Sequence, residues 1–280
     1  MKDQPRYIRP PIAAGVFYPA DPNELVAMVR GYIKSGIEIS GERKIAPRAL
    51  IAPHGGYSVA GKAIAAAYTT VGDFDKKFAR IVILSPSHQL ALRGFALPTA
   101  TAFSTPCGQV GVDPSCFEML KENSLVSVSE TAHKDEFGIE VHLPFVLATF
   151  SDIPLVPIVA GAVSGEEVKE LLDMLKCGPE TLIVVSSDLS HYFPIYETER
   201  LDKQTSKFIT ELTPERMDRA HACGSTLIQG LLLFAKENNY QADELYLCNT
   251  AELTNNSEQV VGYGSFVFLP NKNKRAEHLH

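Results

Sequence analysis

The sequence predicts an α/β fold, namely one three-layer αβα domain whose central sheet is mixed but largely parallel. Short apolar runs alternate with helical patterns along the chain, which is typical of a sheet that helices cover on both faces. Three of these runs, at 49–52, 80–84 and 181–185, are each followed by a turn that carries a histidine. No internal repeat or linker divides the 280 residues, so we expect a single domain over residues 1–280.

The N-terminal part of the chain is predicted to run from an extended segment into a helix. The segment 9–20 is apolar and bounded by prolines. Asp21 is a suitable N-cap and Pro22 suits the first helical position, so a helix is expected to begin here and to end near Ile33. The polar, glycine-containing stretch from Lys34 to Lys44 is predicted to be a loop.

The other elements follow from the spacing of apolar residues. Helical spacing is present at 59–68, 114–120, 146–150, 168–175, 201–212 and 223–234. Strands are expected at 95–98, 102–103, 124–129, 155–160, 245–247 and 260–268. The alternation of polar and apolar residues at 124–129 is typical of an edge strand, and the short strands near Leu97 and Val126 should make the sheet mixed.

Composition argues against several functional classes. The formal net charge is −7, the pI is about 5.6 and no basic run interrupts the chain, so no nucleic-acid partner is expected. No apolar run reaches the roughly 18 residues of a membrane span, and the N-terminus lacks the apolar core of a signal peptide. The five cysteines are odd in number and widely spaced, which favours free thiols and a reducing compartment. We therefore expect a cytoplasmic protein with no membrane partner.

Histidines that follow strands form the first candidate site. His54, His88 and His191 each come after a buried strand, and the carboxyl ends of parallel strands meet at one edge of an α/β sheet. His54 and His88 together with Cys223 would supply two imidazoles and one anionic ligand, a set that suits iron, copper or zinc and leaves positions open for substrate. A single histidine at a strand end is more often an ordinary surface residue, but several at one edge favour a metal site.

The choice of the third metal ligand stays open between Cys223 and Glu140. Glu140 would complete the facial triad of iron oxygenases, whereas Cys223 would give a softer site that also accepts copper or zinc. Cys223 stands just before a predicted helix, where the helix dipole is expected to lower the pKa of the thiol. His142 and His133 are weaker candidates, because His142 stands where it can simply cap a helix.

Asp188 and His191 form a second constellation. They are three residues apart on a turn and can hydrogen-bond, so Asp188 is predicted to orient the imidazole and raise its basicity. Asp188 has the alternative role of capping a turn or helix. Ser187 and Ser190 lie beside the pair and bring a metal-free serine hydrolase into consideration, but no GxSxG elbow is present.

Seven short motifs lie along nearly the whole chain: RPPIAAGVFYPA at 9–20, IAPHGGY at 51–57, LSPSH at 84–88, IEVHLP at 139–144, VSSDLSH at 185–191, ACG at 222–224 and VVGY at 260–263. In combination they resemble the Memo family, whose bacterial and archaeal members are also called AmmeMemoRadiSam system protein B. The resemblance implies a fold related to the class III extradiol dioxygenases, which use non-haem iron.

The resemblance also implies site residues. His54, His88 and Cys223 match the proposed iron or copper ligands of the family, and Asp188 and His191 match other residues of the same pocket. His191 lies where the dioxygenases keep an acid/base histidine. The resemblance therefore implies iron or copper as the cofactor, or no bound metal in the protein as isolated.

Partners and substrate are less defined by the resemblance. The eukaryotic member is linked to receptor tyrosine kinase signalling, cell motility and copper-dependent redox chemistry. Prokaryotic members co-occur with an AMMECR1-like protein and a radical-SAM protein, which implies a functional link to both. Two departures concern the substrate: the chain has Glu136-Phe137-Gly138 where the family often has Glu-His-Ser, and it has Ser225 to Leu227 where a proline is common.

Three functions therefore compete at the level of the sequence. The first is a metal-dependent redox enzyme with dioxygenase-like chemistry on an unknown small molecule. The second is a non-enzymatic module that uses the same pocket to bind a peptide or an anion. The third is a metal-free hydrolase that relies on His191. The residues favour the first modestly over the second, and the metal content of protein purified anaerobically would separate them.

Overall fold

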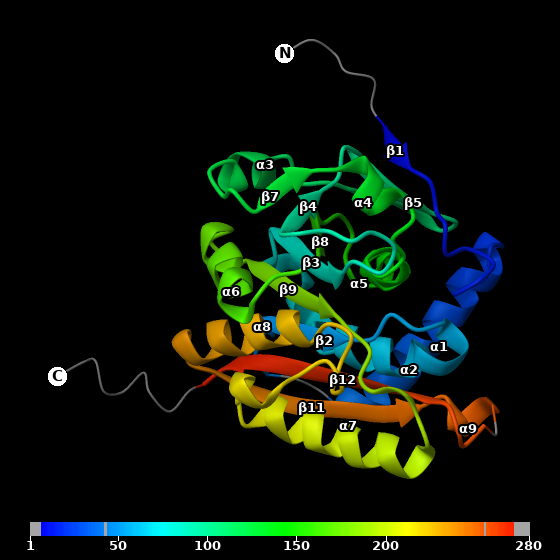
Figure 1. The fold of residues 1–280 in the computed structure, drawn as a ribbon. Helices are drawn as coiled ribbons and strands as arrows, with labels where there is room; N and C mark the ends of the chain where they lie inside the picture. Colours follow the sequence, from blue (N-terminus) through cyan, green and yellow to red (C-terminus); the bar gives the residue numbers. More distant parts are fainter. Residues whose placement is uncertain (1–6, 42–43, 255, 272–280) are drawn as a thin grey trace.

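The computed structural model describes residues 7–41, 44–254 and 256–271 (Figure 1). Its main feature is a nine-stranded sheet with the order β10-β12-β2-β9-β3-β8-β4-β7, in which β11 also pairs with β12. These strands are β2 (Ala49–Ala52), β3 (Arg80–Pro86), β4 (Phe95–Leu97), β7 (Val126–Val128), β8 (Leu155–Ala160), β9 (Thr181–Ser186), β10 (His191–Phe193), β11 (Tyr240–Asn249) and β12 (Val260–Pro270).

The four central strands β2, β9, β3 and β8 run parallel to one another. Antiparallel pairs flank them, with β12 against β2 on one side and β4 against β8 on the other. The edge strand β7 pairs in parallel with β4, so the predicted edge strand is confirmed. The predicted mixed sheet with a parallel centre is also confirmed, and the strands that precede the candidate site are direct neighbours.

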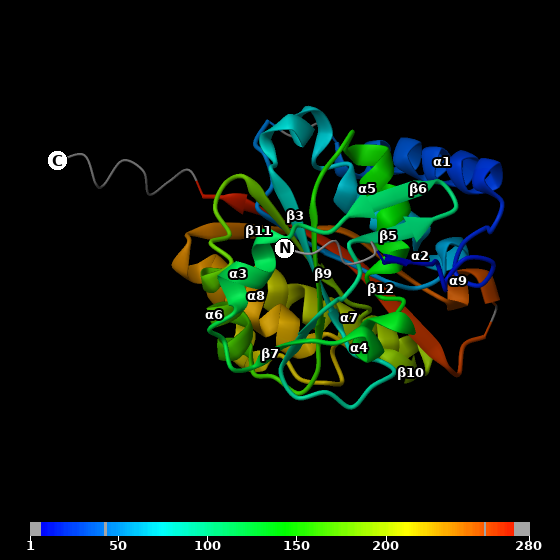
Figure 2. The ribbon, with the colours of Figure 1, turned by 90° about the horizontal axis from the view of Figure 1, so that it is seen from above.

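Helices cover both faces of the sheet, as Figure 2 shows, and the predicted αβα layering is confirmed. Side chains of the central strands alternate between two apolar cores, so that Leu50 and Val184 face one core while Ile51 and Val185 face the other. The first core is covered by α1 (Pro22–Ser40), α2 (Tyr57–Tyr68) and α5 (Leu143–Thr149). The second is covered by α3 (Ser115–Leu120), α6 (Gly165–Met174), α7 (Ile195–Thr210) and α8 (Ser225–Glu237).

The connections contain shorter elements and a second sheet. The short helices are α4 (Glu130–Lys134) and α9 (Ala251–Thr254), with 3-10 turns η1 (Gly72–Lys77), η2 (Glu140–His142) and η3 (Pro214–Arg216). In the small sheet, β1 (Ile8–Arg9) pairs with β5 (Ala102–Thr105), which pairs with β6 (Gly108–Gly111). The sequence predicts a strand at 102–103 but not its partner β1. The pairing of β1 brings Arg9 against the segment 133–140, which leads to the candidate site.

Helix α1 is longer than the sequence predicts. Asp21 caps its first turn, as expected, but the helix continues through Ser40 instead of ending near Ile33. Gly36, which favours a loop in the sequence, is a point of contact with α2, because a Cβ atom there would lie 2.8 Å from the backbone of Ala65. A glycine that lets two helices approach closely cannot be distinguished from a loop glycine in one sequence. The predicted loop is therefore helical over most of its length.

The boundaries of α7 also differ from the prediction of a helix at 201–212. The helix begins at Ile195 and ends at Thr210. Its buried face includes the polar residues Thr198, Asp202 and Thr205. Because the buried face is partly polar, apolar residues do not recur clearly at helical spacing. The first turns of α7 are therefore not recognised in the sequence.

The described residues include no helix with the length and apolar character needed to cross a membrane. All five cysteines are free thiols, as their odd number and wide spacing predict.

Gly31 and Gly36 provide a matched test of the contact between α1 and α2. Both lie in α1, but a Cβ atom at Gly31 would meet no atom within 4 Å. We expect Gly31→Ala to raise the free energy of unfolding by about 0.5–1 kcal/mol, because alanine is the better helix former. Gly36→Ala should lower it by about 1–3 kcal/mol, because the added methyl group would overlap the backbone of α2. Urea unfolding followed by circular dichroism measures both, and a stabilising Gly36→Ala would contradict the contact.

Candidate metal centre

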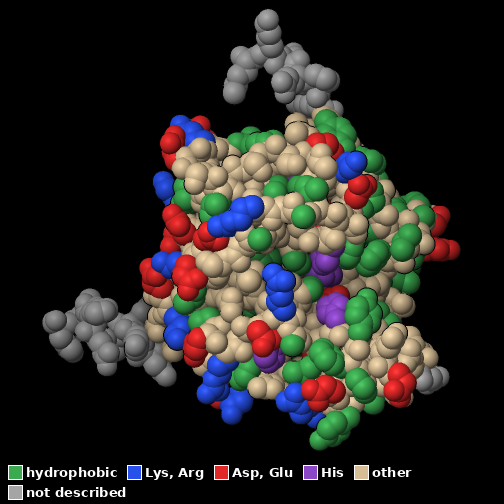
Figure 3. Space-filling view, in the orientation of Figure 1, with side chains coloured by type: hydrophobic (Ala, Val, Ile, Leu, Met, Phe, Trp, Pro, Cys, Tyr) green, Lys and Arg blue, Asp and Glu red, His purple; other side chains and the backbone are tan. Residues whose placement is uncertain are grey.

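The candidate site lies at the carboxyl-terminal edge of the parallel strands. His54, His88 and Asp188 each stand two residues beyond the end of a neighbouring strand, namely β2, β3 and β9. Cys223 approaches the same edge from the turn before α8. One ligand atom from each of His54, His88 and Cys223 lies within 4.8 Å of the other two. Histidine side chains, coloured purple, gather in a hollow of the surface in Figure 3.

His54 is buried and its tautomer is fixed by hydrogen bonds. The hydroxyl of Ser186 donates to the carbonyl of Gly138 at 2.7 Å, so its oxygen accepts the 2.8 Å hydrogen bond from Nδ1–H of His54. The lone pair of Nε2 is therefore free and faces Sγ of Cys223, 3.4 Å away. Burial, reinforced by the neighbouring His88, lowers the pKa of His54 to about 3. The ring is neutral, which is the form that binds a metal.

Glu136 orients the second imidazole, that of His88. One carboxylate oxygen accepts from Nδ1 of His88 and the other from its backbone amide, both at 2.8 Å. Because an ionised carboxylate only accepts, Nδ1 carries the proton and Nε2 is free. Burial disfavours ionisation of Glu136, but hydrogen bonds from His88 and Gly138 outweigh it and hold the pKa of Glu136 below its usual value. A carboxylate behind a histidine is the usual support of a metal ligand.

Phe137 forms an apolar wall beside both imidazoles. Its ring stacks with His88 at 4.8 Å between centroids and meets His54 edge-on at 5.7 Å. Phe17 from the N-terminal segment stacks with Phe137 at 4.5 Å. Phe137 is the departure from the Glu-His-Ser pattern, so an apolar ring stands where a polar one is common. The wall keeps water from one side of the two ligand rings.

The thiol of Cys223 lies in the site, but the prediction of a lowered pKa is wrong. Burial, followed by the negative charge of Asp188, raises the pKa of Cys223 to about 12. The thiol donates toward Nε2 of His54, and the backbone amide of Asp188 donates to Sγ at 3.3 Å. Helix α8 begins only at Ser225, so its dipole does not offset the loss of water around the sulfur. A bound cation would reverse this balance, because it displaces the thiol proton.

Asp188 and His191 are neighbours, but the predicted orienting hydrogen bond between them is absent. Nδ1 of His191 donates to the carbonyl of Leu189 at 2.8 Å, while Oδ2 of Asp188 lies 4.0 Å from Nε2 of His191. Asp188 instead accepts a 2.8 Å hydrogen bond from the backbone amide of His54. Burial raises the pKa of Asp188. A nearby backbone carbonyl thus takes the orienting role that the sequence spacing suggests for Asp188.

The three imidazoles at this edge share one arrangement. His54, His88 and His191 each bond the surrounding protein through Nδ1, and among the described residues only the thiol of Cys223 hydrogen-bonds to one of their Nε2 atoms, that of His54. No hydrogen bond joins His191 to Ser187 or Ser190 in the part of the chain that the structure describes, since Ser187 donates to a backbone carbonyl and the hydroxyl of Ser190 is buried without a partner. The geometry therefore does not favour the hydrolase reading.

Glu140 lies outside the site, so the iron-oxygenase triad that includes it is wrong. Its side chain is completely buried and pairs with Arg9, whose Nη1 donates to it at 2.7 Å. The hydroxyl of Tyr18 donates at 2.6 Å, and the backbone amides of Ile12 and Ala13 also donate. Both carboxylate oxygens are thus occupied by hydrogen-bond donors of the N-terminal segment and are not free to bind a metal.

His142 and His133 also lie outside the site. His142 is completely buried against Tyr68, and neither of its ring nitrogens has a hydrogen-bond partner among the described residues. Burial lowers the pKa of His142 to about 3. His133 donates from Nε2 to the carbonyl of Ala96 at 2.9 Å, and burial lowers its pKa to about 4. Both are neutral core histidines.

A cleft of about 810 Å³ opens beside the centre. Its lining includes His191, Cys223, Tyr192, Arg93 and Arg219, and no lining residue is acidic. Tyr192 is 71% exposed and has a φ of 61°, a left-handed conformation that is unfavourable for tyrosine. Arg93 forms an ion pair, whereas Arg219 forms neither an ion pair nor a hydrogen bond within the described part of the chain. The cleft thus presents a free cation and an exposed aromatic ring next to the imidazoles.

Two residues that hold the candidate ligands, Glu136 and Ser186, are not evident from the sequence as parts of the site. A signal for Ser186 does exist, because β9 lies beside β2 in parallel and Ser186 is in register with Ala52, two residues before His54. That register is known only once the strand order is known. Glu136 lies on a loop 48 residues from His88 and carries no periodic pattern, so nothing local links the two.

A family model described as "Memo-like protein" matches residues 9–267. The chain belongs to the Memo-like family. Proteins named "MEMO1 family protein" from Archaeoglobus fulgidus and Methanosarcina barkeri are 28% and 30% identical to it, and each match covers 93% of this chain and 99% of the relative. "Protein MEMO1" of Xenopus tropicalis is 30% identical over 223 residues, which cover 72% of this chain and 73% of that protein. The resemblance noted in the motifs is therefore confirmed.

The crystal structure of an uncharacterized protein from Escherichia coli K12 is similar in fold, with a TM-score of 0.51. The match covers 79% of this chain and 98% of that chain at 14% sequence identity, so the likeness concerns the fold alone.

The support that Glu136 gives to His88 predicts a loss of metal affinity in Glu136→Gln. An amide keeps the shape of the side chain but no longer fixes the proton on Nδ1 with a negative charge, so affinity for Co(II) should fall about 10- to 100-fold. Competition titration under anaerobic conditions measures this. Glu130→Gln, which changes a glutamate of α4 outside the site, is the matched control. Equal loss in both variants would contradict the role of Glu136.

The buried neutral histidines predict a loss of stability in acid. The pKa values of His54, His133 and His142 are lowered to about 3, 4 and 3, whereas an unfolded chain binds these protons near pH 6.5. Below pH 6.5 the unfolded state therefore binds protons that the folded state does not, and the free energy of unfolding falls as the pH falls toward 4. Each such histidine contributes up to about 1.4 kcal/mol per pH unit.

His142→Leu isolates one of these contributions, because His142 has no hydrogen bond to lose among the described residues. The decrease in the free energy of unfolding between pH 6 and pH 4.5 should become smaller by up to about 1.4 kcal/mol per pH unit. Urea unfolding at a series of pH values measures the slope. A slope equal to that of the wild type would show that His142 is protonated in the folded protein.

Proposed function

We propose that this protein binds iron or copper through His54, His88 and Cys223 and carries out redox chemistry on a substrate held in the adjacent cleft. One observation carries the proposal: two imidazole nitrogens without protons and one thiol sulfur lie within 4.8 Å of one another at a sheet edge. The hydrogen bonds of Ser186 and Glu136 fix both rings in this orientation. Such support of free ligand nitrogens is what a metal site requires.

The donor set suits a soft or borderline metal. Imidazole binds iron, copper and zinc, and a thiolate favours Cu(I), zinc and iron. Cys223 would bind as the thiolate after loss of its proton. With three protein ligands, further positions stay open toward the cleft. When bound, iron or copper supplies one-electron and oxygen chemistry that protein side chains lack.

His191 is the proposed acid/base residue of this site. Its Nδ1 is held by the carbonyl of Leu189, its Nε2 is free, and 30% of its side chain is exposed. The residue also lines the cleft, so a substrate hydroxyl could transfer a proton to Nε2. Asp188 lies 4.0 Å from Nε2, beside the atom that would receive this proton.

The free thiols support a reducing, cytoplasmic location for this chemistry. All five cysteines are unpaired, which is usual where glutathione and thioredoxin keep thiols reduced. A thiol ligand is sensitive to oxidation, and a reducing compartment would protect it.

A second candidate function is a binding site for an anionic molecule or peptide without chemistry. The observation that favours it is the charge of the cleft, which has no acidic lining residue and contains the unpaired Arg219. An anionic substrate of the redox enzyme would fit the same features. The two functions differ in whether the protein holds a metal.

Anaerobic purification followed by metal analysis tests the proposal, and cysteine variants locate the site. Cys223→Ser should weaken binding of Cu(I) at least tenfold, because the hydroxyl is a much poorer ligand for a soft metal. Cys107→Ser, which changes a half-buried thiol outside the site, should leave it unchanged. Competition titration against a chromophoric Cu(I) chelator measures both.

Protein that contains no iron or copper, and that binds Cu(I) no better than Cys223→Ser does, would contradict the redox proposal. The same result would favour the anion-binding function.

A further inference from the structure

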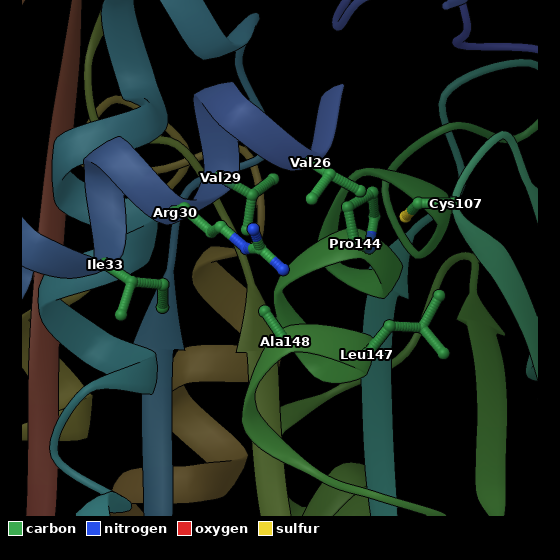
Figure 4. Close-up of a pocket in the computed structure, with 8 residues that line it drawn as sticks. All are labelled: Val26, Val29, Arg30, Ile33, Cys107, Pro144, Leu147 and Ala148. Carbon is green, nitrogen blue, oxygen red and sulfur yellow. The ribbon is translucent and has the colours of Figure 1, made fainter. Parts of the chain in front are cut away.

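A second cavity lies away from the metal centre, between helices α1 and α5 (Figure 4). Its volume is about 400 Å³, which is within the range of small-molecule sites. None of its lining residues lines the cleft beside Cys223. The walls are mostly apolar, and the apolar side chains are Val26, Val29, Ile33, Pro144, Leu147 and Ala148.

The walls of this cavity are held in place by the core. Val29 is buried, and Ile33, Leu147 and Cys107 pack against the buried core residues. The turn between β5 and β6 closes against α5, since a Cβ atom at Gly108 would come within 3.2 Å of Leu147. The cavity is therefore largely formed before any ligand binds, which lowers the entropic cost of binding.

Arg30 is the charged residue of the lining, and no acidic residue accompanies it. Figure 4 shows its guanidinium directed into the space between the two helices. Within the described part of the chain it forms no ion pair and no hydrogen bond. Its neighbours at helical spacing are Val26, Ala27, Ile33 and Lys34, so α1 offers it no acidic partner.

The single charged side chain of the cavity has apolar residues around it. In Figure 4, Ile33 and Cys107 lie at opposite ends and Arg30 lies between them. A guanidinium can merely cover apolar surface with its stem. Arg30 is exposed and its guanidinium has no protein partner among the described residues, so an anionic group in the cavity would replace water there with two parallel hydrogen bonds.

We propose that this cavity binds a small monocarboxylate with a hydrocarbon chain. The carboxylate would pair with Arg30, and the chain would lie along the apolar walls, where each buried methylene contributes about 0.8 kcal/mol. A short carboxylate lacks the chain, and an alkylammonium ion would be repelled by Arg30. The proposal is independent of the redox function, since it uses other residues.

Titration calorimetry of the full-length protein with sodium octanoate tests this binding. We expect saturable binding of octanoate, at least tenfold weaker binding of acetate, and no binding of octylammonium. Arg30→Gln should weaken octanoate binding at least tenfold. Lys34→Gln, which removes a positive charge one turn farther along α1 and outside the cavity, should change it less than twofold.

Cys107 provides a second readout, because its half-buried thiol lines the cavity. Saturating octanoate should slow alkylation of Cys107 at least threefold, as measured by peptide mass spectrometry, and leave that of Cys223 unchanged. Ala148→Phe places a ring at an exposed wall position and should abolish this protection. Wild-type protein that does not bind octanoate, or binding that survives both Arg30→Gln and Ala148→Phe, would overturn the proposal.

Discussion

The geometry of the candidate metal centre depends on the buried ion pair between Arg9 and Glu140. Both side chains are almost completely inaccessible to solvent, at 1% and 0%. Arg9 also donates from Nε to the carbonyl of His133 and from Nη2 to that of Glu136, so one guanidinium holds three points of the segment before α5. Loss of one partner would leave a buried charge without compensation, at a cost of about 3–5 kcal/mol. Because Glu136 in turn holds both the amide and the ring of His88, the N-terminal strand positions a candidate metal ligand without touching it.

The parallel strands supply the second constraint. Their carboxyl ends converge, and His54, His88 and Asp188 occupy equivalent places two residues beyond them. Convergence alone would only bring polar groups together. What makes the group suited to a metal is that the fold uses one nitrogen of each ring, Nδ1, and leaves the other free. The acceptor for Nδ1 of His54 is Ser186 of the neighbouring strand β9, and the acceptor for Nδ1 of His88 is Glu136 of a distant loop. The sheet topology and the N-terminal segment that holds this loop therefore both contribute to one centre.

Much of this arrangement follows from the sequence. The buried strands and the turns after them are visible as apolar runs that end in histidine, and their common edge follows from the rules of parallel sheets, so His54, His88 and His191 could be placed together. The pairing of Glu140 with Arg9 could not be predicted, because the two residues are 131 positions apart in the sequence. The raised pKa of Cys223 depends on burial, which the position of a helix does not reveal. The sequence spacing favours a hydrogen bond between Asp188 and His191, but the imidazole donates from Nδ1 to the carbonyl of Leu189 instead.

If the centre binds a metal as proposed, the state of the thiol would link that binding to the protonation of the centre. Without a metal, the burial that raises the pKa of Cys223 keeps it a neutral thiol, and burial also keeps His54 a neutral base. Cys223 and His54 themselves therefore carry no charge without a metal, and the buried carboxylate of Glu136 is compensated by the hydrogen bonds that it accepts from His88 and Gly138. A cation bound as proposed would take the place of the thiol proton and would be compensated by the resulting thiolate. At the proposed metal site, affinity would consequently rise with pH, and the apolar wall would strengthen the pairing of thiolate and cation by excluding water from one side.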